Sequence, residues 1–248
     1  MSGAPAVSGV NGKIAASFGA VNDAGAGTIF GSFVTPLGHS FGLQLDGSVA
    51  STDGDGSYGV GAHAFWRDPA AGLLGVYASY SGFDGDRDVN LGIVAAESEV
   101  YFGRLSLEGL AGVDYGYGDT DLFGAVTAAF YPIDDLRLYA GYLNVTGDNF
   151  ASMGAEWQPD FAFARNTSLF ADGLVGEDDA WSVMGGVRFY LGGGTKSLIR
   201  RHREDDPGDL GLRALGQALD RLQEKKEPES DGFVCPPGSV KTSWGCLY

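Results

Sequence analysis

The sequence predicts an all-β protein: an antiparallel up-and-down transmembrane β-barrel of about 12 strands, followed by a short C-terminal helical tail. Three observations predict this fold. Turn signals recur at regular intervals between residues 12 and 192, the segments between them alternate apolar with polar residues, and few residues are charged. The 248 residues include 41 Gly, 15 Phe, 11 Tyr and 4 Trp, which suits short strands joined by tight turns.

The turn signals are of two kinds that alternate along the chain. One kind is acidic and rich in glycine, at residues 22–27, 51–56, 83–88, 117–121, 146–149 and 176–179. The other kind mostly carries Pro or Arg, at residues 35–38, 67–69, 103–104, 131–135 and 158–166. Since successive turns of a meander lie at opposite ends of the barrel, the two ends are predicted to face different compartments.

The segments between the turns have the length that a tilted transmembrane strand needs. The predicted strands are 12–22, 27–36, 39–51, 57–67, 72–83, 88–102, 104–117, 121–132, 136–147, 149–158, 166–176 and 180–192.

Alternation is clear in the segment 39–51. There Leu43 and Leu45 share one face, and Gln44 and Asp46 share the other. Two later segments alternate in the same way. The polar faces carry too much charge for a packed core, so we expect the apolar faces to meet lipid and the polar faces to line a wet lumen.

Aromatic residues gather near the ends of the predicted strands, which is typical of the girdles that a barrel places at both membrane interfaces. The alternative is the ordinary preference of aromatic residues for strands. The residues are Tyr58, Trp66, Tyr115, Tyr117, Tyr131, Trp157, Trp181, Phe189 and Tyr190.

The net charge of −16 lies entirely in the strand region. Residues 1–192 contain 7 Lys and Arg against 23 Asp and Glu, whereas residues 193–248 contain 9 of each. Such a surface makes nucleic acid an unfavourable partner and favours cations. The first residues lack a basic and apolar leader, so we interpret the sequence as a mature form whose signal peptide has been removed; the alternative is a cytosolic protein.

The composition changes after the last predicted strand, so residues 1–192 form the predicted barrel and residues 193–248 a predicted periplasmic tail. Within the tail, an amphipathic helix is predicted at about 209–226, because its leucines share one face. They are Leu212, Leu215, Leu219 and Leu222. The terminal piece contains Cys235 and Cys246, for which an oxidising compartment predicts a disulfide.

These features together resemble the porin-like outer-membrane β-barrels of Gram-negative bacteria. The closing segment 181–191 alternates and ends in aromatic residues, which resembles the signal by which such barrels are recognised for assembly. The resemblance implies an outer-membrane location and solute passage. Two departures from the family are the 56 residues that follow the closing segment and the absence of a long loop that could constrict the lumen.

The alternation also predicts which charged side chains line the lumen. The predicted pore-lining residues are Asp46, His63, Glu97, Glu99, Glu108, Asp114, Arg137, Glu156, Asp172 and Arg188. Acidic residues outnumber basic ones, so an open pore would favour cations. Alternatively, the arginines pair with carboxylates across the barrel and plug it.

No metal, cofactor or catalytic site is predicted. The acidic turns 84–88 and 53–57 begin like calcium loops but lack the required Gly and Glu at the later positions, so they are interpreted as hairpin turns of type I′. His63 has no serine placed to work with it in the sequence, and a lone histidine in a lumen is more often a lining residue.

The predicted function is therefore a porin-like channel for passive diffusion of small solutes, with a preference for cations, and not an enzyme. The alternative is a closed structural or adhesion-type barrel that acts through its acidic turns or its tail. The predicted partners are outer-membrane lipid, lipopolysaccharide, small solutes or cations, and a periplasmic partner for the tail helix.

Overall fold

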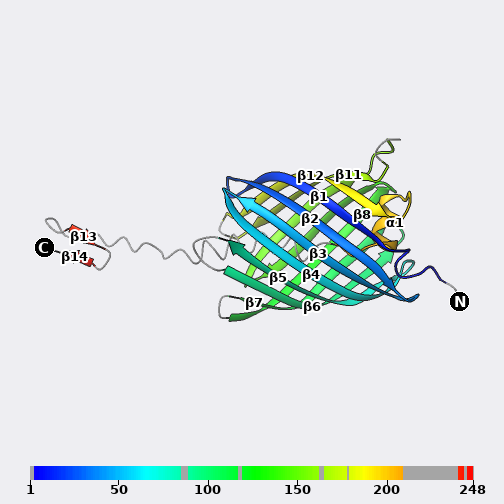
Figure 1. Ribbon diagram of the computed structural model, residues 1–248, viewed down its shortest axis with the longest axis horizontal. Helices are drawn as coiled ribbons and strands as arrows, with labels where there is room; N and C mark the ends of the chain where they lie inside the picture. Colours follow the sequence, from blue (N-terminus) through cyan, green and yellow to red (C-terminus); the bar gives the residue numbers. More distant parts are fainter. Residues whose placement is uncertain are drawn as a thin grey trace.

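The computed structural model describes residues 3–84, 89–116, 119–161, 165–177, 179–208, 240–242 and 245–247. In these residues, twelve strands form one closed antiparallel barrel (Figure 1). The strands are β1 (Asn11–Val21), β2 (Ala24–Leu37), β3 (Phe41–Thr52), β4 (Asp55–Asp68), β5 (Gly72–Asp84), β6 (Val89–Phe102), β7 (Leu105–Gly116), β8 (Asp119–Ile133), β9 (Leu136–Val145), β10 (Asp148–Trp157), β11 (Thr167–Gly176) and β12 (Trp181–Gly192).

The barrel closes where β12 pairs with β1, so no strand of the barrel is left with an unpaired edge. The pairing brings Ala15 opposite Arg188 and Asn11 opposite Gly192. All other strands pair with their neighbours in the sequence. The predicted fold class and strand number are therefore confirmed, and no strand boundary differs from its prediction by more than three residues.

The turns at one end of the barrel are shorter than the acidic segments predicted for them. Asn22 and Asp23 both have positive φ, 46° and 69°, as a type I′ turn requires. Asp53 and Gly54 are also both positive, at 50° and 95°. Because two residues suffice to turn the chain, the strands continue into the acidic segments. We call this end the acidic end, and the end where β1 begins the N-terminal end.

The two faces of the wall have opposite chemistry. Outward side chains are apolar, as shown by Phe18 and Leu122, which are 75% and 77% exposed. Inward side chains include Gln44 and His63, which are buried. The predicted inside–outside assignment of 39–51 is confirmed, because Leu45 is exposed and Gln44 is not. An apolar exterior on a closed barrel is the surface that a lipid bilayer covers.

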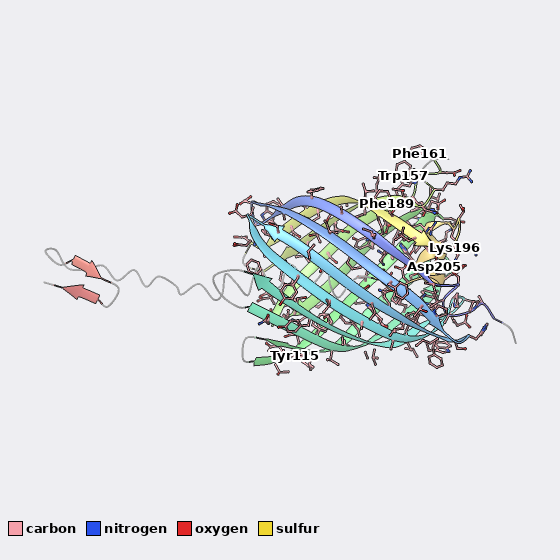
Figure 2. All side chains as sticks on the ribbon, viewed as in Figure 1. Tyr115, Trp157, Phe161, Phe189, Lys196 and Asp205 are labelled. Atoms are coloured by element: carbon pink, nitrogen blue, oxygen red, sulfur yellow. The ribbon has the colours of Figure 1, made fainter. Side chains whose placement is uncertain are left out.

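Exposed aromatic side chains lie near both ends of the barrel, with Tyr115 at one end and Trp157 and Phe189 towards the other (Figure 2). The prediction of the aromatic girdle is wrong for two residues. Tyr131 and Tyr190 are buried, because their positions in β8 and β12 point into the lumen. The period of two along a strand, rather than the distance from its end, determines which aromatic rings reach lipid.

The barrel is wider than its own side chains can fill. Twelve strands about 4.8 Å apart and tilted by about 40° enclose a backbone cylinder roughly 24 Å across. Inward side chains occupy about 5 Å from each side, half the spacing of two packed sheets, and leave a channel about 14 Å wide. Other parts of the chain must therefore enter the lumen if it is to be filled.

One such part is α1 (Leu198–Glu204), at the N-terminal end of the barrel (Figure 1). The sequence did not predict this helix, which falls in a basic segment of the tail. Gly192, Gly193 and Gly194 connect it to β12 with φ of 78°, 66° and 67°, values that favour glycine. This left-handed turn brings the chain back over the mouth of the barrel. The described helix is too short to span a membrane.

The remainder of the tail is described only at β13 (Val240–Thr242) and β14 (Gly245–Leu247), which pair with each other. The predicted helix at 209–226 lies outside the described residues. The predicted disulfide is not supported: no disulfide is found in the part of the chain that the structure describes, and Cys235 lies outside that part.

Candidate functional site: the charged lumen and its mouth

The polar residues of the inner wall form three clusters, of which the first surrounds His63 on β4. Its Nδ1 lies 2.6 Å from an oxygen of Glu97, and its Nε2 lies 3.0 Å from an oxygen of Asp46. Gln44 donates to the same aspartate at 3.0 Å, and the Tyr77 ring lies 4.6 Å from the imidazole. Both imidazole nitrogens are therefore held by carboxylates.

The second cluster joins Arg137 on β9 to Glu108 on β7. The guanidinium donates to both carboxylate oxygens, at 2.8 and 2.9 Å, and the Tyr139 ring lies 4.5 Å from its centre. Both charged side chains are buried. Charge-assisted hydrogen bonds of this kind are the stronger ones in proteins.

The third cluster centres on Glu156 of β10, which is almost fully buried. It accepts hydrogen bonds from Arg188 at 2.5 Å, from Ser168 at 2.5 Å and from the Tyr190 hydroxyl at 2.7 Å. His202 of α1 lies 3.5 Å away. This carboxylate therefore links three strands of the wall to the helix in the mouth.

These pairs run around the wall rather than across the lumen. Arg137 and Glu108 lie two strands apart, as do Arg188 and Glu156. The arginines do pair with carboxylates, but along the wall and not across the lumen, as the predicted alternative requires. Pairing along the wall neutralises the charge of the wall locally. It leaves the central channel to be filled by other residues.

Helix α1 fills the N-terminal mouth through its basic residues. The Arg201 guanidinium is buried and donates to Gln158 at 2.9 Å and to Asn166 at 2.7 Å. Arg203 donates to the backbone oxygens of Gly103 and Leu105, at 2.8 and 3.0 Å. Both arginines thus satisfy carbonyl groups of the turns at the rim.

His202 of α1 points to the wall between these arginines. Its Nδ1 lies 2.9 Å from the hydroxyl of Tyr131, and its Nε2 lies 3.2 Å from the hydroxyl of Tyr190. The two tyrosines that were expected in the aromatic girdle therefore hold the helix in the mouth. Their aromatic rings are rigid, and their hydroxyl groups point into the lumen.

Acidic residues at the end of α1 complete the closure. The Asp205 carboxylate accepts hydrogen bonds from Lys196 and Ser8, both at 2.5 Å. Burial raises the pKa of Asp205, although the hydrogen bonds from Lys196 and Ser8 act in the opposite direction. Asp206, which is also buried, pairs with Lys13 of β1. The residues that follow α1 are therefore bonded to the segment before β1, through Ser8, and to β1 itself, through Lys13.

A cavity of about 20 Å³ lies where the helix meets the wall, which is room for about one water molecule. Its lining consists of Lys13, Glu99, Glu108, Arg137, Arg188, His202, Pro207 and Gly208.

The structure places nearly all predicted lining residues on the inner face. Nine of them are buried there: Asp46, His63, Glu97, Glu99, Glu108, Asp114, Arg137, Glu156 and Arg188. Asp172 of β11 is half-buried on the same face as Ser168. Asp114 lies apart from the three clusters, near the acidic end, where it accepts a hydrogen bond from the Thr146 backbone at 2.9 Å.

Sequence reasoning missed several residues of the mouth. Lys13 and Arg67 are buried on the inner face, and the period-two pattern could have found both. Arg201, Asp205 and Asp206 could not be found in this way, because their burial depends on where the tail folds back.

The described histidines do not form a catalytic arrangement with serine. The hydrogen bonds of His63 go to carboxylates, and those of His202 go to tyrosines. In the same part of the chain, no group of three or more His, Cys, Asp or Glu side chains could hold a metal ion.

No protein-family model and no curated protein matches this sequence. Solved structures do share its fold. One is the KdgM porin, with a TM-score of 0.56, 11% identity, and coverage of 71% of this chain and 98% of the porin. Another is outer membrane phospholipase A from Escherichia coli, with a TM-score of 0.50, 13% identity, and coverage of 74% and 92%.

The chain therefore has the fold of an outer-membrane β-barrel. More particularly, its closed wall of twelve strands is similar in fold to the KdgM porin, in agreement with the predicted resemblance to porin-like barrels.

Proposed function

We propose that this protein is a porin-like outer-membrane channel for passive diffusion of small solutes, which its own α1 segment holds closed. One observation carries this proposal: a segment of the tail, and not the wall itself, is hydrogen-bonded to opposite parts of the rim at the mouth of the wide lumen. A segment joined to the wall through three glycines can leave without unfolding the barrel. The likeness to the KdgM porin supports the channel class.

The same proposal includes a preference for cations. Among the described side chains that are buried in the wall, seven carboxylates face four Lys and Arg residues. A water-filled passage lined with excess negative charge concentrates cations and repels anions. No catalysis is proposed.

We further propose that the acidic end faces outwards and the N-terminal end faces the periplasm. The acidic turns would then lie beside lipopolysaccharide, whose phosphates they could approach through divalent cations. The apolar exterior would contact membrane lipid. The closed mouth would face the periplasm, where a partner could reach α1.

Planar-bilayer conductance tests this proposal with a matched pair of variants on α1. Arg201→Ala removes buried hydrogen bonds to two residues of the rim, so we expect at least a tenfold rise in the fraction of time spent open. Arg200→Ala removes only an exposed pair with Glu204 and should behave as the unmodified protein. Reversal potentials in a salt gradient should show cation selectivity.

The alternative function, a closed structural or adhesion-type barrel, is favoured by the small space between α1 and the wall. If both variants fold and neither conducts, the channel proposal is wrong and this alternative takes its place. Openings that favour anions would contradict only the cation preference.

A further inference from the structure

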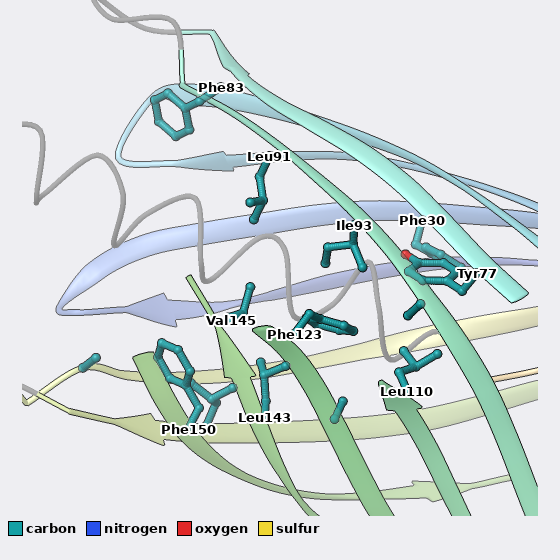
Figure 3. Packing of buried hydrophobic residues seen from close by; sticks show 14 of the residues in the cluster. Phe30, Tyr77, Phe83, Leu91, Ile93, Leu110, Phe123, Leu143, Val145 and Phe150 are labelled. Carbon is teal, nitrogen blue, oxygen red and sulfur yellow. The ribbon is translucent and has the colours of Figure 1, made fainter. Parts of the chain in front are cut away.

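Two groups of apolar side chains inside the barrel differ in their origin. The first lines the half of the lumen towards the acidic end, which we call the acidic half, and includes Ile93 and Val145 of the wall (Figure 3). The second lies in the other half and consists of Val7, Val34, Phe65 and Leu73. Three of these four belong to the wall, whereas Val7 belongs to the segment before β1. The wall therefore forms an apolar site, which we call the Val7 site.

The Val7 site exists because the inner wall has no side chain at Gly42 of β3. A Cβ added to Gly42 would meet Cγ2 of Val7 at 2.6 Å and would overlap the Phe65 ring as well. Val7 is only 2% exposed where it fills this site. Removing an aliphatic group from water is favourable whichever molecule carries it, so the site also suits a branched aliphatic group of a solute.

The Arg67 guanidinium lies beside the Val7 site with one edge unused. It is 2% exposed, and its central carbon lies 4.7 Å from the centre of the Phe65 ring. Its Nη1 donates to the backbone oxygen of Ala6 over a long 3.4 Å. Its Nε and Nη2 donate to none of the residues that the structure describes. Buried donors of a charged group are costly without an acceptor, so an acceptor is expected here.

The same edge of another arginine in this protein binds a carboxylate. Arg200 uses its Nε and Nη2 for the two oxygens of Glu204, at 2.7 and 2.9 Å. The wall carboxylate two strands from Arg67 belongs to Glu99, which accepts a hydrogen bond from Tyr101 at 2.5 Å instead. The free edge of Arg67 therefore fits the carboxylate of a solute, which it would bind through two charge-assisted hydrogen bonds.

A buried acceptor also adjoins Phe65. Glu97 uses its Oε2 for His63, but within the described part of the chain its Oε1 has no hydrogen-bond partner. This oxygen lies over Gly75, the residue that pairs with Phe65, because a Cβ on Gly75 would meet it at 2.5 Å. A free carboxylate oxygen of this kind suits a charged donor such as an ammonium group.

The segment before β1 covers the Val7 site and is bonded to α1. The Ala6 backbone donates to the oxygen of His39 at 2.8 Å, and the Ser8 backbone donates to the oxygen of Glu204 at 2.9 Å. The Ser8 side chain also bonds to Asp205. Because Ser8 is bonded to the end of α1, release of the helix weakens the hold on this segment. Departure of Ala6 and Val7 leaves room for a molecule of the size of one amino acid.

We propose that Arg67, Glu97 and the Val7 site together bind a small zwitterion with an aliphatic side chain, such as a branched α-amino acid, and that residues 6–8 occupy this place in the closed protein. The carboxylate of the solute lies on the free edge of Arg67, its ammonium group at Glu97, and its side chain in the position of Val7. The inference rests on the proposed channel, for which it names a class of solute. A zwitterion has no net charge, so the excess acid of the lumen does not repel it.

Binding of L-leucine to the full-length protein in detergent, measured by isothermal titration calorimetry, tests the proposal. Val7→Asn places an amide in the apolar site and should release the segment. We expect the dissociation constant of L-leucine to be at least tenfold lower than for the unmodified protein. Val10→Asn makes the same change at a side chain that is 59% exposed, so this matched control should bind as the unmodified protein does.

Two analogues of the probe distinguish the polar contacts in the Val7→Asn protein. Leucinamide lacks the carboxylate that Arg67 would hold, and isocaproate lacks the ammonium group that Glu97 would hold. Each should bind at least tenfold more weakly than L-leucine. If either analogue binds as tightly as L-leucine, the proposed site is wrong. The comparison needs no substitution of Arg67 or Glu97, so it does not depend on whether such variants fold.

Limited proteolysis of residues 4–8 shows whether the segment has been released. Released segments without tighter binding of L-leucine would overturn the proposal, and so would unchanged protection in Val7→Asn, because Val7 would then not hold the segment. The titration does not measure conductance. A protein that conducts but does not bind L-leucine contradicts this inference alone, and one that binds it but never conducts contradicts the channel proposal alone.

Discussion

The two halves of the lumen differ in how their inner walls are stabilised. In the N-terminal half, buried charged side chains such as Arg188 and Glu156 pair along the wall, and α1 bonds to them. In the acidic half, side chains such as Ile93 and Val145 are buried without polar partners of their own. A charged lining can be satisfied locally by its neighbours, whereas an apolar lining depends on what fills the space in front of it. The two halves of the inner wall therefore depend on two different kinds of contact.

The largest expected effect is in the charged half. Arg188→Leu leaves the buried Glu156 carboxylate without its main counter-charge, which should lower the free energy of unfolding by about 3–5 kcal/mol. Urea unfolding in lipid vesicles, followed by tryptophan fluorescence, measures this loss. Adding Glu156→Gln to this variant removes the unpaired charge and should restore most of the lost free energy of unfolding. Equal losses in the single and double variants would show that the ion pair does not stabilise this half.

The second largest expected effect distinguishes an acidic half whose lumen is filled by apolar groups from one whose lumen is filled by water. Ile93→Asn places an amide in the apolar lining and should lower the free energy of unfolding by about 2–4 kcal/mol if that lining is covered. Ile93→Val, which keeps the side chain apolar, should cost about 0.5–1.5 kcal/mol in the same urea titration. If the asparagine variant is as stable as the valine variant, water already fills this half and the comparison fails.

The smallest effect concerns the glycine turn that leads to α1. A Cβ on Gly193 would meet the Asp205 carboxylate at 2.7 Å and would also occupy a left-handed φ, so Gly193→Ala should weaken docking of α1 by about 2 kcal/mol. Gly194→Ala shares the left-handed φ but meets no atom within 4 Å, and about 1 kcal/mol is expected. Protease sensitivity of residues 196–206 in vesicles should rank the two variants in this order. The reverse order would mean that contact with Asp205 does not hold the mouth closed.

Most of the wall could be predicted from local pattern. Alternation in β3 placed Leu45 outside and Asp46 inside, and turn chemistry positioned the hairpins. Tyr131 and Tyr190 follow the same period of two and point inwards, although both lie near strand ends. The contacts of α1 could not be predicted, because a basic segment beside a glycine run carries no periodic signal of its destination.

By itself, the sequence determined the barrel, its twelve strands and the inner face on which Glu156 and Arg188 lie, because a strand alternates its side chains with every residue. Only the tertiary structure decided how those charges pair and what occupies the mouth. Arg188 and Glu156 are 32 residues apart, and Lys13 and Asp206 are 193 apart. Such contacts follow from the closure of the wall and from the path of the tail, which no local pattern specifies.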